Sequence, residues 1–531
     1  MWSLRLVGLT AAVTLTMQIT AMPGNAATSY SATALSHCPA YWTGTSLPVP
    51  PAPTAISGRI QSVAVLSPSD IWMLVLTGSP YVYHFNGTIW QGPTSPGGGA
   101  SFIAKSLVAS SDSNVWVVGV SDAGTPLAWN YNGQSWINQS PSLSAYAGLT
   151  AAAIASNGTL YVAGSRNNVS GNAGLIWSYS GGQWTNITPS NPAQSYNALA
   201  VSEDGTLIAG GNSGALQEMS GDAWTTISIP PDVGISDITS TSSGTVYAVG
   251  GDTSGPILIQ QEPGSASATV RSVPAPFHAD VYEMGVTASG PGDVWLFGQY
   301  ITPSQPYRPW ITHFDGQAFT VASTPSFSSG DYAITGGALL GNMVLAYGSE
   351  DTASGLPATK LLAVCPIQVT SASITPSSTR LRPADQTFWS VPTSENVNHD
   401  LMSPGLFNTG LIGPGGSFEY TFFAAADYSV RDTTTGSRST VEVVPGVTPS
   451  AGEVDTVFTI TAANIEAPVG YKYRVLIKRP HSTRYVLLTT TTQPTVNFIP
   501  GTLAGTYSFE CELKTPSGVT SPSPAVNVSV S

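Results

Sequence analysis

The sequence NVWVVG at residues 114–119, followed by WNYNGQSW at 129–136, decides the fold because this pair of stretches recurs along the chain. The anchor residue of each copy, Trp116 in this one, stands at positions 72, 116, 161, 208, 247, 295 and about 345. Consecutive copies are therefore 39 to about 50 residues apart. Short alternating runs separated by Gly-rich turns fill each interval. A period of about 40–50 residues with four short strands per unit is typical of a β-propeller.

These repeats resemble the units of secreted bacterial propellers related to the Kelch and galactose-oxidase-like families. The resemblance covers residues 37–366 and implies a fold rather than a chemistry, so we expect a seven-bladed β-propeller there. The seventh unit ends at 360–365 without its last strand, and the stretch 37–42 (HCPAYW) is expected to supply it. Cys38 and Cys365 would then lie on adjacent strands and form a disulfide in an exported protein. Two unrelated free thiols are the alternative.

The sequence pattern changes over residues 367–445, where PGGSFEYTF at 414–422 resembles the cupredoxin (plastocyanin-like) family. His399 stands where that family has its first copper ligand. A blue-copper site also needs a Cys thiolate, a second His and usually a Met in one loop. Here the loop 431–438 reads RDTTTGSR, with Asp432 or its neighbour at the Cys position. We therefore expect a cupredoxin-like sandwich without a metal site, in which His399 is a packed or surface histidine.

Residues 446–531 contain alternating runs at the spacing of an immunoglobulin-like sandwich. In the run 505–514, Cys511 shares a face with apolar residues, so we expect a buried, unreactive thiol. Four basic residues lie between Lys472 and Arg479. A solvated edge that prevents aggregation explains them better than a contact for an anionic wall polymer.

The first residues predict export. A short basic start at 1–5 precedes an apolar or small-residue stretch at 6–21, and Ala26 and Ala27 follow a Pro-Gly break. This pattern predicts a signal peptide over residues 1–26. No later segment offers 18 consecutive apolar residues, so the mature chain is expected to be secreted, soluble and without a membrane span.

Composition excludes several classes of partner. Charged residues make up 9% of the 531 residues, against about 25% in typical proteins. The net charge is -13, which argues against nucleic-acid binding because phosphate contacts need clustered Lys and Arg. The acidity is concentrated in the propeller, which has 6 basic and 18 acidic residues, whereas residues 446–531 have 6 and 5.

The search for catalytic residues gives few candidates. The arginines of the propeller, which are Arg59, Arg166, Arg271 and Arg308, do not form the constellation of a sialidase. His84 and His313 occupy equivalent positions in two repeats and are interpreted as repeat residues rather than ligands. Glu203 and Asp204 could form a glycosidase pair, but they lie on a repeat turn, which favours a structural role.

All-β architecture, export and the missing constellations favour an exported, non-enzymatic recognition or scaffold protein. Its propeller face would bind an extracellular glycan or protein, with no cofactor. A propeller-type polysaccharide hydrolase or lyase is the alternative. Copper electron transfer is a further alternative that lacks ligands.

Overall fold

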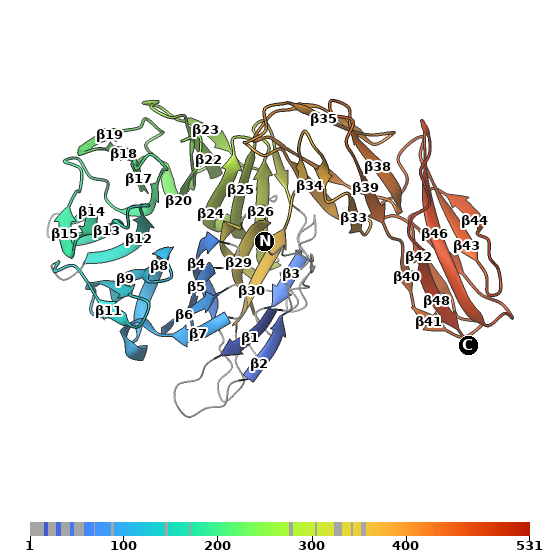
Figure 1. Cartoon of the computed structure of the whole chain (residues 1–531), viewed down its shortest axis with the longest axis horizontal. Helices are drawn as coiled ribbons and strands as arrows, with labels where there is room; N and C mark the ends of the chain where they lie inside the picture. The colour runs from blue at the N-terminus through green and yellow to red at the C-terminus, as the bar shows by residue number, and fades with distance from the viewer. Residues whose placement is uncertain are drawn as a thin grey trace, which may run out of the picture.

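The computed structural model describes residues 15–19, 28–32, 43–46, 58–67, 70–86, 90–143, 147–168, 171–275, 280–302, 305–322, 332–340, 343–351 and 357–531. Within these ranges the regular structure is all β apart from a short 3-10 helix, η1 (Pro96–Gly99). A ring of four-stranded sheets is followed by two β-sandwiches (Figure 1). None of the described segments forms a helix long and apolar enough to cross a membrane.

Each sheet of the ring is antiparallel, and its strands pair with their neighbours in chain order. The first three sheets comprise β4 (Arg59–Ser67), β5 (Asp70–Leu76), β6 (Pro80–Phe85) and β7 (Trp90–Thr94); β8 (Phe102–Ser111), β9 (Asn114–Ser121), β10 (Pro126–Tyr131) and β11 (Trp136–Asn138); and β12 (Ala147–Ile154), β13 (Leu160–Asn168), β14 (Gly171–Ser180) and β15 (Gln183–Asn186). The next three comprise β16 (Tyr196–Val201), β17 (Leu207–Gly211), β18 (Leu216–Ser220) and β19 (Ala223–Thr226); β20 (Gly234–Ser240), β21 (Val246–Asp252), β22 (Gly255–Gln261) and β23 (Thr269–Ser272); and β24 (Asp280–Gly290), β25 (Asp293–Thr302), β26 (Gln305–Phe314) and β27 (Phe319–Val321).

The last sheet of the ring contains β28 (Tyr332–Leu340), β29 (Met343–Asp351) and β30 (Pro357–Val364). Its outer strand is β3 (Thr43–Ser46), which pairs antiparallel with β30. A strand from the N-terminal part of the chain therefore completes this sheet, as expected, but it begins at Thr43. Residues 37–42, and with them Cys38, lie outside the described residues, so the disulfide to Cys365 stays a prediction. Further upstream, β1 (Leu15–Ile19) and β2 (Thr28–Ala32) pair antiparallel.

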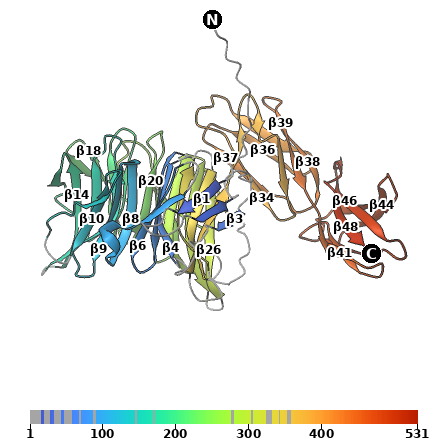
Figure 2. The same cartoon turned by 60° about the horizontal axis from the view of Figure 1, so that its bottom comes forward.

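The first strands of the sheets line the centre of the ring, each against the first strand of the next sheet, and β28 packs against β4. This closed arrangement is a β-propeller (Figures 1 and 2). Polar side chains of the first strands bond to the backbone of the next sheet, as in Thr150 Oγ1 to Tyr196 O (2.6 Å), Asn197 Nδ2 to Ile235 O (3.1 Å), Val286 N to Asp237 Oδ2 (2.9 Å) and Thr335 Oγ1 to Ile60 O (2.5 Å). The bond from Thr335 joins the last sheet to the first.

In five sheets the glycine that stands three residues after the anchor residue has a steric reason. The first strands carry a shift in register, a β-bulge, at matching places, for example between Ile235 and Asp237. The carbonyl just before the bulge approaches the glycine of the second strand so closely that a Cβ there would lie 1.8–2.1 Å from the oxygen. The glycines concerned are Gly119, Gly164, Gly211, Gly250 and Gly348. In these five sheets the close approach therefore leaves no room for a side chain at the glycine. In the first sheet Val75 stands at the corresponding place, opposite the bulge between Ile60 and Ser62.

Two sandwiches follow the propeller. The first pairs the sheet β32–β31–β34–β37 with the sheet β33–β39–β38–β35–β36, and the second pairs β40–β42–β45 with β41–β48–β46–β43–β44, with β47 on β46. Their bounds are β31 (Ile367–Val369), β32 (Ile374–Thr375), β33 (Ser378–Leu381), β34 (Gln386–Ser390), β35 (His399–Ser403), β36 (Phe407–Ile412), β37 (Ser417–Thr421), β38 (Ala426–Asp432) and β39 (Arg438–Val443); then β40 (Gly446–Thr448), β41 (Ala451–Gly452), β42 (Phe458–Thr461), β43 (Lys472–Lys478), β44 (Val486–Thr491), β45 (Thr495–Phe498), β46 (Gly505–Thr515), β47 (Gly518–Val519) and β48 (Val526–Val530).

One hydrophobic core runs through both sandwiches. At their junction the Ala425 amide donates to Ala462 O at 2.7 Å, and the Asn464 amide donates to Phe423 O at 3.0 Å. These backbone bonds, together with the shared core, fix one sandwich on the other.

Replacing Gly250 by Ala should destabilise the propeller by about 3 kcal/mol, because the new Cβ would meet a backbone oxygen at 1.9 Å. Gly251→Ala is the matched control: its Cβ would meet its nearest atom at 3.3 Å, so the change should cost less than about 1 kcal/mol. Urea denaturation followed by circular dichroism measures both. Equal effects of the two substitutions would contradict this explanation of the repeat glycine.

Candidate functional site

A set of three side chains recurs at the start of the second strand of the sheets. In the first sheet it consists of Asp70, Trp72 and His84, and Trp72 pairs across strands with His84. Trp295 pairs in the same way with His313 in the sheet that begins with β24. The structure thus confirms that His84 and His313 are equivalent repeat residues. The corresponding set in the second sheet is Asn114, Trp116 and Asn130.

A cavity of about 190 Å³ lies between the first two sheets, and we call it the first-blade pocket. Its lining residues are Trp72, Val82, His84, Gln91, Gly92, Thr94, Asp112, Ser113, Tyr131 and Gly133. The His84 ring stacks on Trp72 with the ring centres 3.9 Å apart and an angle of 9° between the planes. Tyr131, from the second sheet, packs against Trp72 at 5.6 Å. The aromatic rings thus hold each other in place at one wall of the pocket.

The indole N–H of Trp72 differs from those of its counterparts. Trp116 Nε1 donates to Asn114 at 2.8 Å, and Trp295 Nε1 donates to Asp293 at 2.7 Å. In the first sheet the Asp70 carboxylate instead bonds to His84 Nε2 at 2.8 Å. Trp72 is 3% exposed, and its buried Nε1 has no hydrogen-bond partner among the described residues. This donor has almost no accessible surface, so it does not open into the pocket.

His313 has a different surrounding because the first sandwich covers it. The ring is fully buried, with Nδ1 2.9 Å from Glu419 Oε2 and Nε2 3.1 Å from Asp293 Oδ1. Ser417 Oγ lies 3.1 Å from Nε2 and donates a short hydrogen bond to Gly292 O. Glu419 and Ser417 belong to β37 of the sandwich, whereas Asp293 and Gly292 belong to the propeller. We call this group the His313 clamp.

The contacts within the clamp determine the protonation states of His313, Asp293 and Glu419. Burial works against a charged ring, but the hydrogen bonds and charges of Asp293 and Glu419 outweigh it and raise the pKa of His313 to about 9. Burial also opposes ionisation of both carboxyls, yet the bond to His313 holds the pKa of each below its ordinary value. The ring is thus an imidazolium that donates through both nitrogens. Such a ring cannot act as a base toward Ser417, so the set works as a buried ion cluster rather than as a hydrolytic triad.

Backbone packing reinforces the clamp. The Gly292 amide donates to Gly415 O at 2.9 Å, and a Cβ on Gly290 would lie 2.9 Å from Gly415 Cα. Phe388 of the sandwich joins the propeller cluster around Trp295, with the two ring centres 4.7 Å apart. The PGG turn at 414–416, predicted as part of a cupredoxin-like motif, therefore forms the contact with the propeller.

His399 and Asp432 contact each other in the first sandwich. His399 Nδ1 is 2.8 Å from Asp432 Oδ2, and both side chains are fully buried. Although burial opposes it, hydrogen bonds from Thr435 and His399 lower the pKa of Asp432. Within the described ranges no group of three His, Cys, Asp or Glu side chains could hold a metal ion. The pair is a buried hydrogen-bonded contact.

The structure also shows the surroundings of the other candidate residues named in the sequence analysis. Cys511 is buried, and burial raises the pKa of its thiol to about 12, so it is an unreactive thiol as predicted. Asp204 accepts hydrogen bonds from Ser202 Oγ (2.5 Å) and from the Thr206 amide (3.0 Å), which holds its pKa down and fixes the β16–β17 turn. Glu203 lies on the same turn, as predicted. The propeller arginines stand on four different sheets: Arg59 on β4, Arg166 on β13, Arg271 on β23 and Arg308 on β26.

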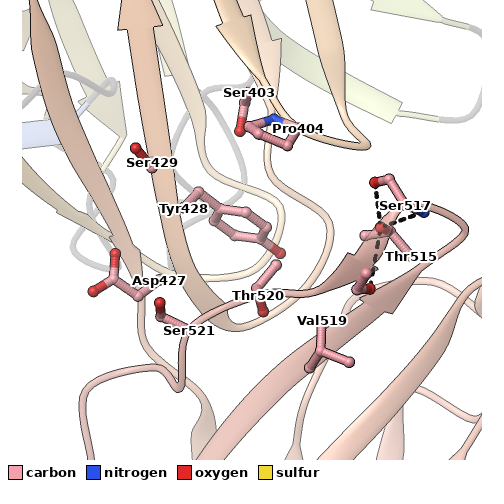
Figure 3. Close-up of a pocket in the computed structure, with 11 residues that line it drawn as sticks. Ser403, Pro404, Asp427, Tyr428, Ser429, Thr515, Ser517, Val519, Thr520 and Ser521 are labelled. Carbon is pink, nitrogen blue, oxygen red and sulfur yellow. Dashed lines mark hydrogen bonds between the residues drawn. The ribbon is translucent and has the colours of Figure 1, made fainter.

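A second cavity, of about 180 Å³, lies at the junction of the two sandwiches (Figure 3). Hydroxyls of Ser403, Ser429, Thr515, Ser517, Thr520 and Ser521 line it, together with the Asp427 carboxylate. Burial and the neighbouring Glu442 raise the pKa of Asp427. Thr515 and Ser517 bond to each other at 2.8 Å, so part of this polar surface is already satisfied. Its lining holds no histidine, lysine, arginine or cysteine.

Comparisons with known proteins assign the chain to no family. No family model matches the chain, and no curated protein matches it. Among solved structures, YCF48 bound to a D1 peptide is 15% identical at a TM-score of 0.42, covering 62% of this chain and 98% of its own. The polysaccharide lyase Uly1 is 11% identical at a TM-score of 0.38, and the match covers 67% of this chain and 98% of the lyase chain. The Aleuria aurantia lectin in complex with alpha-methyl-L-fucoside is 14% identical at a TM-score of 0.35, and the match covers 51% of this chain and 96% of the lectin chain. Likeness at this level says nothing of what the chain binds.

Sequence reasoning missed the first-blade pocket and the role of Glu419. No sequence signal indicates the pocket, because the same combination of Asp and His recurs at Asp293 and His313, where the carboxylate bonds to both the indole and the histidine. Glu419 bonds to a residue 106 positions earlier, so no local pattern could indicate it.

His313→Gln should destabilise the protein by about 3–5 kcal/mol at pH 7, because it leaves two buried carboxylates without a cation. His84→Gln, at the equivalent but partly exposed position with one carboxylate partner, should cost less than about 1 kcal/mol. Thermal unfolding measures both. Similar losses from the two substitutions would contradict the clamp.

The clamp also predicts a pH window. Because the pKa of His313 is raised, its contribution is complete below about pH 6.5 and is lost as the pH rises through about 9. Because the pKa values of Asp293 and Glu419 are lowered, the stability that these carboxylates contribute is present above about pH 4 and is lost as the pH falls below it. The melting temperature of the wild type should decline above about pH 9, and this decline should be smaller in His313→Gln.

Proposed function

We propose that this chain is an exported, non-enzymatic recognition protein whose propeller binds an extracellular glycan or protein. In this proposal residues 37–366 form a seven-bladed propeller, residues 367–445 a cupredoxin-like sandwich and residues 446–531 an immunoglobulin-like sandwich. The observation that carries it is the first-blade pocket, which presents the exposed side chains of Gln91 and Asp112 and in which no described hydrogen bond joins a hydroxyl to His84 or Asp112. The His313 clamp joins the propeller to the first sandwich, and a shared core joins the two sandwiches. These contacts favour a rigid scaffold for the binding surface.

A polysaccharide hydrolase or lyase is the second candidate, and Asp237 favours it. This residue lies on β20, a first strand of the ring, and burial raises the pKa of its carboxyl to about 6. A carboxyl with a pKa near 6 can serve as a general acid. Its Oδ2 already accepts from the Val286 amide at 2.9 Å, a bond that joins two sheets of the ring, so recognition remains the favoured proposal.

The recognition proposal is tested by binding and turnover on the same materials. Purified mature protein should be retained by at least one extracellular polysaccharide or secreted protein in a pull-down, without releasing reducing ends or unsaturated products. Turnover that Asp237→Asn abolishes would favour the hydrolase or lyase. Failure to bind any polymer or protein of a broad panel at high concentration would contradict recognition.

Export and ring closure make a separate prediction. We propose that residues 1–26 are removed on export and that Cys38 and Cys365 form a disulfide that joins the N-terminal strand to the last sheet. The intact mass of the protein secreted by its native host should lack the first 26 or 27 residues. Reduction before alkylation should add two alkyl groups at these cysteines, as peptide mapping would show. Alkylation of Cys38 and Cys365 in denatured but unreduced protein would contradict the disulfide.

A further inference from the structure

We propose that the cavity at the junction of the two sandwiches binds a primary ammonium group on an alkyl chain, the chemistry of a lysine side chain (Figure 3). We call it the junction cavity. Its walls are the end of β35, the strand β38 and the segment that runs from the end of β46 through β47 to Ser521. The site belongs to the sandwiches, so this inference goes beyond the recognition function proposed for the propeller and does not depend on it.

The first reason is a pair of carboxylates without a cation. Asp427 on β38 stands directly opposite Glu442 on β39, and neither forms an ion pair within the described part of the chain. Like charges directly opposite each other destabilise an antiparallel pair of strands. Burial and the charge of Glu442 accordingly raise the pKa of Asp427. A cation bound beside Asp427 relieves this repulsion.

The order of the strands leaves Asp427 as the acid that needs this cation. Arg380 on β33 is in register with Glu442, and β39 lies between β33 and β38. Ser378 Oγ also donates to Glu442 Oε1 at 3.1 Å. Among the described residues, by contrast, no group donates a hydrogen bond to the Asp427 carboxylate, and this residue lines the cavity.

The second and independent reason is the Ser403 hydroxyl. Ser403 is 2% exposed and lines the cavity beside Pro404 (Figure 3). Its Oγ forms no hydrogen bond with any described residue, yet it is not among the unpartnered polar atoms that have lost their accessible surface. We therefore take the hydroxyl to face the cavity. A buried hydroxyl without a partner lowers stability, and a ligand that bonds to it offsets that loss.

The open polar groups of the cavity are acceptors around one negative charge. Besides Asp427 and Ser403, two exposed residues line it whose hydroxyls have no partner among the described residues, namely Ser429 and Ser521. A primary ammonium carries one positive charge and three N–H donors. It can therefore pair with the carboxylate and donate to hydroxyls at the same time.

The size and the apolar walls of the cavity indicate what carries the ammonium. Sites for drug-sized ligands have about 300–1,000 Å³, and this cavity has about 180 Å³. Pro404 and Val519 form apolar parts of its wall, and Val519 is 48% exposed. The methylene stem of a lysine packs along apolar surface while its charged end reaches polar groups. A single side chain of this kind matches the space.

Other ligand classes fit less well. The Asp427 carboxylate repels anions, and the lining has no lysine, arginine or histidine to attract them. Ca²⁺ takes about 6–8 oxygen ligands, whereas this lining offers one carboxylate, and no metal-binding group of three side chains occurs in the described ranges. A quaternary ammonium needs an open aromatic face, but Tyr428, the aromatic residue of the lining, is 2% exposed.

Saturation-transfer NMR and thermal unfolding of the mature full chain test the proposal. The probe is Nα-acetyl-lysine methylamide. Its Nε-acetylated form removes the charge, tetramethylammonium keeps a charge without N–H donors, and glucosamine carries an ammonium on a sugar ring. The lysine derivative should bind and raise the melting temperature, and the other three should bind at least tenfold more weakly.

Two substitutions locate the site. Asp427→Asn and Ser403→Ala should each weaken binding of the lysine derivative about tenfold, the loss expected for a hydrogen bond to a charged group. Asp427→Asn should also raise the melting temperature of the ligand-free protein, because it removes the repulsion from Glu442. Asp455→Asn is the matched control, since Asp455 is an exposed acid of the second sandwich outside the cavity lining, and it should change neither quantity. Because Ser403 is buried, the partly exposed Asp427 carries the test if Ser403→Ala fails to fold.

The proposal is overturned if the lysine derivative does not bind at tens of millimolar, or if Asp427→Asn binds it as the wild type does. Equal binding of the Nε-acetylated form or of tetramethylammonium would reject the ammonium donors, and tighter binding of glucosamine would reject the alkyl chain. Displacement of the lysine derivative by millimolar Ca²⁺ in the wild type but not in Asp455→Asn would assign its binding to Asp455 and reject the cavity. Retention of the Asp427→Asn protein on a polysaccharide or secreted protein would keep the recognition function, which fails or stands separately.

Discussion

The propeller depends on a close approach between two backbones. A bulge in the first strand of a sheet brings a carbonyl oxygen to a place where the neighbouring strand has room for hydrogen alone, and five sheets meet this demand with glycine. A bulge also changes the direction of nearby side chains. Side chains beside these bulges bond to backbone atoms of the next sheet, namely those of Thr150, Asn197, Asp237 and Thr335. In these five sheets the recurring glycine and the bulge thus have the same steric cause.

The same repeat residues serve different purposes according to what covers them. His84 is partly open to solvent and bonds to one carboxylate, that of Asp70. His313 is covered by the sandwich, and Glu419 from that sandwich takes its second nitrogen. Covering the ring converts a repeat residue into a buried ion cluster that holds two domains together. The two histidines thus occupy the same repeat position, but the first sandwich, which covers only His313, gives that residue a different role.

Reactive side chains in this protein are largely held by structural bonds. Asp293, His313 and Ser417 would suggest hydrolysis if seen as a list, but the bonds around the ring keep it protonated. His399 and Asp432 are both buried and bond to each other. The first-blade pocket differs in that the side chains of Gln91 and Asp112 at its rim are exposed. This contrast is why binding, rather than catalysis, is the function that we propose.

The sequence by itself determined the all-β class, the propeller repeats, the equivalence of His84 and His313 and the buried Cys511, because each follows from spacing or alternation within a few tens of residues. It predicted an N-terminal strand for the last sheet but placed it at 37–42, whereas the described strand begins at Thr43. Only the tertiary structure decided which polar groups are satisfied. The bond from His313 to Glu419 spans 106 residues, and the pocket at Trp72 exists only where two sheets meet. Contacts between elements distant in sequence leave no local pattern from which they could be predicted.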